Sequence, residues 1–316
     1  MVKTFRLPEF NYEVEIGKVA RQADGSVWLQ KGATTVLATV VGSPSKDFPG
    51  FLPLTVEYRE QFAAAGKIPG GYYKREGKPS DREVLTARLI DRAIRPLFPE
   101  NYFDQTQVVI TVYSVDKEHS PQTMGLIAAS LALSISPLPF MGPVGVVEVG
   151  RLDGKWVIDP RYSESKKSEV RLIVAGTHDG ICMVEGSSKG LAEHDFVDAL
   201  FLAHDKVRDL VKWQTTITQE VGKPKEGIDD PYNWSSWQQK IQEFITADHL
   251  KNSYIADKAE RNAYLKGIRE EFVTQHEEEL TKQEIPTKVI NYIFDLVLKS
   301  KVTELIFEAK KRVDGR

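Results

Sequence analysis

Residues 70–100, GGYYKREGKPSDREVLTARLIDRAIRPLFPE, combine flat rings, positive charge and glycine in one short stretch. Tyr72 and Tyr73 are adjacent, and Lys74 and Arg75 follow them directly. Aromatic rings stack on bases without reading their sequence, and cationic side chains donate hydrogen bonds to phosphate oxygens. The glycine pair before the tyrosines would let the segment project as a loop. These residue types together indicate single-stranded nucleic acid as the leading ligand.

The next residues predict a helix that runs from Ser80 to Arg95. Ser80 and Glu83 have the spacing of a capping box, in which each residue's side chain accepts the other's backbone amide. Pro96 cannot continue a helix and so marks its end. This helix would therefore fix the positions of the charged side chains that it carries.

Three arginines, Arg88, Arg92 and Arg95, fall within an arc of about 60° on this helix. They can form a solvated face that pairs with Asp91, which lies three residues after Arg88 and four before Arg95. One carboxylate cannot neutralise three guanidinium groups, so we expect the face to keep positive charge for phosphate. The opposite side, expected to pack, carries Leu89, Ile90, Ala93 and Ile94.

Composition limits the classes of protein that this chain can belong to. The 316 residues are 41% hydrophobic and 28% charged, which is typical of a folded globular protein. The net charge of −3 means that nucleic acid must be bound by a local basic patch. The single cysteine, Cys182, excludes an intramolecular disulfide and suits a reducing compartment. No apolar run approaches a membrane span of about 18 residues, so we expect a cytoplasmic protein with no membrane partner.

The pattern along the chain predicts an α+β domain followed by a helical one. Short β-rich runs turn at Asp153-Gly154 and Asp179-Gly180, and helical patterns cover 80–95, 120–136 and about 188–214. We expect a layered domain over residues 1–215, a linker rich in Pro and Gly over 216–229, and an all-α domain over 230–311. The tail RVDGR, 312–316, is predicted to be the start of a further domain.

The signature AAAGKIPGGYYKREGKPSDREVLTARLIDRAIRPLFP resembles that of bacterial and organellar polynucleotide phosphorylase, also called polyribonucleotide nucleotidyltransferase. The segments SPQTMGLIAASLALSISPLPF, GPVGVVEVG and LIVAGTHDGICMVEG resemble the first core domain of that family in order and spacing. The helices from about residue 230 resemble its connecting α-helical domain, and RVDGR resembles the start of its second core domain. The chain is therefore similar to the N-terminal half of this family.

This resemblance implies a fold, a reaction and an assembly. The expected fold is a ribonuclease PH-like core of the ribosomal protein S5 domain 2 type, followed by a small all-α domain. The implied full-length enzyme is a homotrimer that degrades RNA processively from its 3′ end. Inorganic phosphate is the co-substrate, nucleoside diphosphates are released, and Mg²⁺ is the cofactor. Ribonuclease E in an RNA degradosome is a possible partner.

The resemblance also implies roles for the residues of the opening stretch. The family's channel loop, whose common pattern is Phe-Phe-Arg-Arg, corresponds here to Tyr72, Tyr73, Lys74 and Arg75. Tyrosine can still stack on a base, and lysine keeps the positive charge but lacks the paired donors of a guanidinium group. Arg88, Arg92 and Arg95 fall on the family's arginine helix. This helix is expected to face RNA and phosphate and so to support catalysis.

Catalytic and metal-binding residues are not expected in this chain. In the family, the metal-binding aspartates and phosphate-binding serines belong to the second core domain. The equivalent segment here, SEVRLIVAGT, has Glu169 and Arg171 in place of the Asp-x-Asp pair, which puts a positive charge into the metal site. We therefore predict that the chain alone does not degrade RNA. The alternatives are a non-catalytic module that binds RNA and assembles subunits, and an unrelated α+β enzyme with a basic helix.

Overall fold

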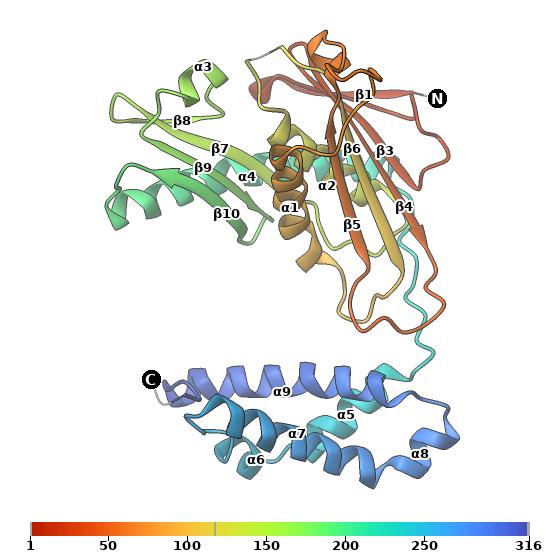
Figure 1. The fold of residues 1–316 in the computed structure, drawn as a ribbon. Coiled ribbons are helices and arrows are strands. Elements are labelled where there is room, and N and C mark those ends of the chain that lie inside the picture. The colour runs from red at the N-terminus through yellow and green to blue at the C-terminus, as the bar shows by residue number, and fades with distance from the viewer. Residues whose placement is uncertain (1, 117, 315–316) are drawn as a thin grey trace. The chain divides into compact units, whose positions relative to one another are not determined.

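The computed structural model describes residues 2–116 and 118–314, and the chain divides into two compact units (Figure 1). Unit 1 consists of Met1–Ser45 and Leu52–Gly227, and unit 2 consists of Lys46–Phe51 and Ile228–Arg316. The segment Lys46–Phe51 therefore belongs to the second unit although it lies early in the sequence. No pattern in the sequence indicated that this early segment belongs to the second unit.

Within the described residues, unit 1 contains two β-sheets (Figure 1). The larger has six strands in the order β1-β2-β3-β4-β6-β5, with β5 and β6 parallel and the other pairs antiparallel. The smaller has the order β10-β9-β7-β8. The predicted hairpins about Asp153-Gly154 and Asp179-Gly180 are confirmed. The strands are β1 Lys3–Leu7, β2 Tyr12–Ile16, β3 Gly25–Lys31, β4 Thr34–Ser43, β5 Leu54–Glu60, β6 Gln105–Ser114, β7 Gly145–Leu152, β8 Lys155–Ile158, β9 Val170–Gly176 and β10 Ile181–Ser188.

Helix α2, Pro121–Ile135, lies in the core of unit 1 and confirms the helix predicted over 120–136. It is buried along almost its whole length and contacts strands of both sheets. Gly25 allows the closest approach, because a Cβ there would lie 2.1 Å from the Ala132 carbonyl oxygen. Around it lie α1, Asp81–Ile94, which packs against β5; the short α3, Tyr162–Ser165; and α4, Glu193–Val221, which covers β7 and β9.

Helix α4 differs in its bounds from the pattern predicted over 188–214. It begins at Glu193, because Gly190 adopts the left-handed φ of +93° and separates it from β10. It continues to Val221, because Ile217 is buried and tertiary packing extends the helix. The first six residues of the predicted linker, 216–221, are therefore helical.

Unit 2 is helical throughout its regular structure in the described residues. Its helices are α5 Trp234–Phe244, α6 Ala247–Lys251, α7 Lys258–Gln275, α8 Glu277–Lys282 and α9 Thr287–Ala309. Phe48, from the early segment, packs its ring against Tyr232 and Tyr292 at centroid distances of 5.9 and 5.7 Å. Of the predicted start of a further domain, residues 315–316 lie outside the described residues. No helix in the described parts of the chain is long and apolar enough to cross a bilayer.

Candidate nucleic-acid interface

The loop before α1 presents two aromatic rings to solvent. Tyr72 is 93% exposed and Tyr73 is 79% exposed. The rings meet edge to face with centroids 5.4 Å apart. Lys74 closes a turn by donating its amide to the Gly71 carbonyl at 3.0 Å, and it adopts a left-handed φ of +51°. A large exposed aromatic pair is unusual outside binding surfaces, so this turn has the geometry of a stacking platform.

Positive charge in the same loop is free of partners. Lys74, Arg75 and Lys78 are exposed and make no ion pair or side-chain hydrogen bond with the residues that the structure describes. The loop is held at its base, where the Glu76 carboxylate accepts the Phe62 amide at 2.9 Å. The rings and the unpaired cations therefore project together from an anchored loop.

Helix α1 begins as the sequence predicts. Ser80 Oγ accepts the Glu83 amide at 3.3 Å, and the Glu83 carboxylate accepts the Ser80 amide at 2.7 Å, which confirms the capping box. Glu83 also accepts the Glu60 amide at 2.9 Å and so ties the start of α1 to the end of β5. Partial desolvation acts to raise the pKa of Glu83, but the Ser80 and Glu60 amides outweigh it and hold that pKa below its usual value.

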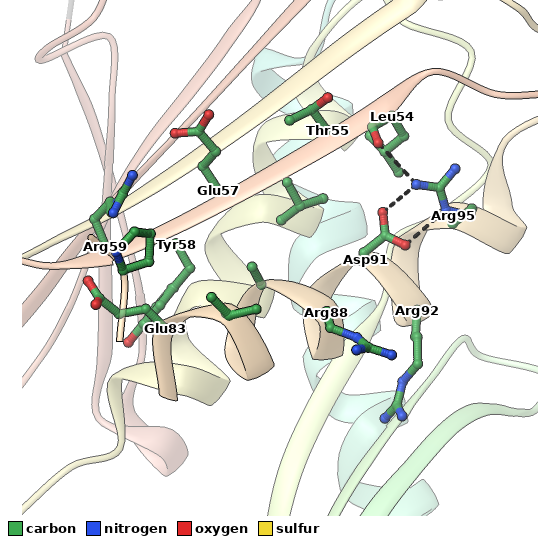
Figure 2. Close-up of a pocket in the computed structure, with 14 residues that line it drawn as sticks. Leu54, Thr55, Glu57, Tyr58, Arg59, Glu83, Arg88, Asp91, Arg92 and Arg95 are labelled. Carbon is green, nitrogen blue, oxygen red and sulfur yellow. Dashed lines mark hydrogen bonds and ion pairs between the residues drawn. The ribbon is translucent and has the colours of Figure 1, made fainter. Parts of the chain in front are cut away.

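Two arginines of α1, Arg88 and Arg92, and Arg95 at its C-terminal cap differ in what they contact (Figure 2). Arg88 is exposed and makes no ion pair or side-chain hydrogen bond with the described residues. Arg92 donates to the Glu185 carboxylate of β10 at 2.6 Å. The side chains of this pair are 49% and 44% exposed, so the contact is open to water and to competing anions. The predicted packing face is confirmed, with Leu89, Ile90, Ala93 and Ile94 buried.

Arg95 is committed to the fold rather than to the surface. Its guanidinium group binds both carboxylate oxygens of Asp91, at 2.9 and 2.6 Å. It also donates to the carbonyl of Leu54 at 3.0 Å, as Figure 2 shows. A further donor binds the carbonyl of Leu52 at 2.9 Å. The pairing with Asp91 that the helical spacing allows is therefore confirmed for Arg95, whose remaining donors bind the carbonyls of Leu52 and Leu54. We expected the face to keep positive charge for phosphate, and Arg95 contributes least to it. Of the three, the described structure leaves Arg88 unpaired.

A pocket of about 520 Å³ lies between α1 and β5 and is lined by all three arginines. Its lining also includes carboxylates, so its interior is not uniformly positive. The lining residues are Leu54, Thr55, Val56, Glu57, Tyr58, Arg59, Pro79, Glu83, Val84, Ala87, Arg88, Asp91, Arg92 and Arg95.

Arg171 of β9, which stands in place of one aspartate of the family's Asp-x-Asp pair, forms an ion pair with Glu148 of β7. Arg171 donates to the two carboxylate oxygens of Glu148 at 2.9 and 3.2 Å, and to Gln122 at 3.2 Å. The Glu148 side chain is only 5% exposed, and its carboxylate raises the pKa of Arg171. Magnesium needs oxygen ligands whose negative charge is available. Because Arg171 takes up both oxygens of Glu148, the residues here do not fit a magnesium ion.

The same ion pair lines a second pocket, of about 710 Å³, which also includes Arg82, Tyr162 and Glu185. No group of three or more His, Cys, Asp or Glu side chains that could hold a metal ion is found among the described residues.

Comparisons with known proteins divide the chain into three matched regions. Residues 11–139 match domain 1 of the 3′ exoribonuclease family, and residues 142–206 match its domain 2. Residues 236–316 match the RNA binding domain of polyribonucleotide nucleotidyltransferase. The chain is 39% identical over 309 residues to the polyribonucleotide nucleotidyltransferase of Finegoldia magna, an alignment that covers 96% of the chain.

The chain belongs to the polyribonucleotide nucleotidyltransferase family. A second polyribonucleotide nucleotidyltransferase, from Heliobacterium modesticaldum, is 41% identical over 306 residues, which again cover 96% of the chain. The chain spans 42% of the length of each of these two relatives. The predicted resemblance to one part of this family is therefore confirmed.

A solved structure supports the fold. The Archaeoglobus fulgidus exosome, solved with RNA bound to the active site, has a chain that superposes with a TM-score of 0.50 at 20% identity. The superposition covers 66% of this chain and 88% of that one. With the two matched ribonuclease PH domains, it confirms the expected α+β, ribonuclease PH-like fold.

Proposed function

We propose that this chain forms the RNA-binding surface of a polyribonucleotide nucleotidyltransferase that shortens RNA from its 3′ end by phosphorolysis. The observation that carries the proposal is the pair of exposed rings, Tyr72 and Tyr73, beside the unpaired cations Lys74 and Arg75. Stacking and phosphate contacts hold a single strand with little regard to its sequence. Such binding suits an enzyme that must move along RNA of any composition.

Two arginines of α1 extend this surface. Arg88 contacts phosphate directly, because no described carboxylate competes for it. Arg92 joins by exchanging the half-exposed Glu185 for a phosphate oxygen. Arg95 supports the interface from behind by holding α1 against β5.

The binding proposal is tested by fluorescence anisotropy with labelled oligo(A) over a range of salt concentrations. Phosphate contacts predict that log affinity falls linearly with log salt, with a slope of about −0.7 for each phosphate neutralised on a single strand. We expect a slope that corresponds to several contacts. Affinity that did not respond to salt would contradict the proposal.

We propose that the chain alone does not cleave RNA. Support comes from Arg171, which stands where the resemblance would place a metal-binding aspartate and forms an ion pair with the buried Glu148. In this proposal, Mg²⁺ and inorganic phosphate bind in the part of the relatives that has no counterpart in this chain. Incubation with labelled oligo(A), phosphate and magnesium should release no nucleoside diphosphate. Addition of that remaining part from a relative should restore release; if it does not, the chain is a non-catalytic RNA-binding and assembly module.

The relatives' likeness also supports a proposal about assembly and context. We propose that the full-length enzyme acts as a cytoplasmic homotrimer in mRNA degradation, with degradosome components such as ribonuclease E as possible partners. The mass of this chain in solution, measured by light scattering with and without oligo(A), tests whether the described units suffice for a trimer. A strictly monomeric chain would assign trimer formation to the remaining part of the relatives.

A further inference from the structure

Strand β5 forms one edge of the six-stranded sheet and pairs only on one side, with β6, among the described strands. Successive peptide groups of a strand point to opposite sides. Arg95 binds the Leu54 carbonyl from the outer side, and Glu83 binds the Glu60 amide from that side too. The peptide groups of Val56 and Tyr58, which lie between them at the same two-residue spacing, therefore also face outward.

Helix α1 closes both ends of this edge and leaves its middle open. At one end Arg95 takes the carbonyls of Leu52 and Leu54, and at the other Glu83 takes the Glu60 amide. The outward amides and carbonyls of Val56 and Tyr58 have no hydrogen-bond partner among the described residues. Natural proteins usually cover or block an open strand edge, because it can pair with another strand.

The pocket of about 520 Å³ lies along this open stretch, between β5 and α1 (Figure 2). We call it the edge groove; it is lined by Leu54–Arg59 and by α1. Its volume lies within the usual range for ligand sites. The open edge is therefore accompanied by space that a short segment can enter.

The backbone groups along the edge groove favour a peptide over a nucleic acid. Val56 and Tyr58, whose outward amides and carbonyls are unpaired in the described structure, line this groove, and so do Glu57, Glu83 and Asp91. A phosphodiester has no N–H or O–H to donate to these carbonyls, whereas a peptide backbone supplies both donors and acceptors. Alternating donors and acceptors at strand spacing are instead what an added β-strand requires.

The charges of the edge groove indicate what kind of peptide fits. Glu83 and Asp91 are already engaged, by backbone amides and by Arg95. Arg88 and Arg59 line the groove without an ion pair to any described residue, as does Glu57, so positive charge exceeds negative charge among the unpaired side chains. The apolar part of the lining comes from Val56, Val84 and Ala87, and Val84 is 45% exposed. An extended segment that alternates apolar and acidic side chains matches this lining.

We propose that the edge groove binds an extended acidic peptide of a protein partner, which adds a strand to β5 at Val56 and Tyr58. The proposal goes beyond RNA binding. Because Arg88 lines the groove and also belongs to the proposed RNA surface, a bound acidic peptide and RNA compete for that side chain. A partner that carried such a segment would therefore weaken the hold on RNA.

The test uses the peptide Val-Glu-Val-Glu-Val, blocked at both ends, and residue-resolved amide hydrogen exchange by NMR. Binding should slow exchange at the Val56 and Tyr58 amides by about tenfold or more, and leave Glu57, which faces β6, unchanged. A peptide N-methylated at alternate residues cannot pair and should not protect them. No protection with the first peptide, or equal binding of the second, would overturn the proposal.

Charge variants separate the peptide from RNA as the occupant. Arg88→Glu should weaken the acidic peptide by about tenfold and strengthen Val-Lys-Val-Lys-Val, while Lys155→Glu, an exposed residue of β8, should change neither. Oligo(A) should leave Val56 and Tyr58 unprotected; their protection by RNA would assign the groove to nucleic acid instead. If the unaltered chain binds oligo(A) but not the acidic peptide, this inference is wrong and the proposed RNA binding still stands.

Discussion

Arg88 on α1 and Arg171 on β9 are both basic residues of unit 1, yet their surroundings are opposite. Arg88 is exposed with no described partner, and the neighbouring loop adds unpaired cations and two exposed rings. Arg171 is bound through two hydrogen bonds to a carboxylate that is nearly inaccessible to water. The difference shows that positive charge in a sequence indicates a binding surface only where the fold supplies no buried counter-charge.

The strongest test of the exposed region is the variant Tyr72→Ala with Tyr73→Ala. Each stacked base contributes about 1–3 kcal/mol, so loss of both rings should weaken oligo(A) binding by roughly a hundredfold or more. Anisotropy titration at constant salt measures this. The matched control is Tyr72→Phe with Tyr73→Phe, which keeps the rings and should bind nearly as well as the unaltered chain. Full affinity in the alanine variant would remove the tyrosines from the interface.

Loss of the Arg171–Glu148 ion pair should lower the stability of the fold. Arg171→Ala leaves Glu148 buried without a counter-charge, and we expect the free energy of unfolding to fall by about 2–3 kcal/mol, somewhat less than for a fully buried pair. Urea denaturation followed by circular dichroism measures the loss. Addition of Glu148→Gln to that variant should recover part of it, because the unpaired charge is removed. An unchanged midpoint for Arg171→Ala would show that the pair contributes nothing.

Arg88→Ala should show the reverse behaviour. Its stability should stay within about 0.5 kcal/mol of the unaltered chain, because no described contact is lost. Its affinity for oligo(A) should fall by about 1 kcal/mol, and the salt slope should shrink by about one contact. Lys155→Ala removes the same charge from β8 and serves as the control. A loss of stability without a loss of RNA affinity would mean that Arg88, like Arg171, has a structural role and does not bind RNA.

Arg92 is intermediate between the unpaired Arg88 and the paired Arg171, because its ion pair with Glu185 is half-exposed. Substitution of Glu185 should have the smallest effect on RNA affinity. Glu185→Gln removes the carboxylate that occupies Arg92, and exposed pairs of this kind contribute about 0–1 kcal/mol. Affinity for oligo(A) should therefore rise by about twofold to threefold at low salt. Glu193→Gln, at an exposed position at the start of α4, removes equal charge elsewhere and should have no effect. Weaker binding in Glu185→Gln would mean that this carboxylate positions Arg92 for RNA.

Local signals in the sequence were sufficient for the elements that carry the interface. Ser80, Glu83 and Pro96 predicted both ends of α1, because capping and helix termination depend on neighbours a few residues away. The four apolar residues of its packing face were predicted for the same reason. The glycine-containing turns likewise located the β-hairpins of the smaller sheet.

Contacts distant in sequence could not be found in this way. Glu185 lies 93 residues from Arg92, so no helical spacing indicates their ion pair. Arg95 binds the carbonyls of Leu52 and Leu54, and a backbone acceptor leaves no trace in residue type. Spacing along α1 showed three equivalent arginines, whereas the sheets that surround the helix make them different.

The membership of Lys46–Phe51 in unit 2 affects how this protein can be dissected genetically. The chain passes between the units at three places, so no single cut separates them cleanly. A fragment that began at residue 228 would lack Phe48, whose backbone carbonyl accepts a hydrogen bond from Lys288 at 2.8 Å and whose side chain is 5% exposed. Such a fragment would lose the ring of Phe48 that packs against Tyr232 and Tyr292. Fusing residues 46–51 to its N-terminus would restore that contact.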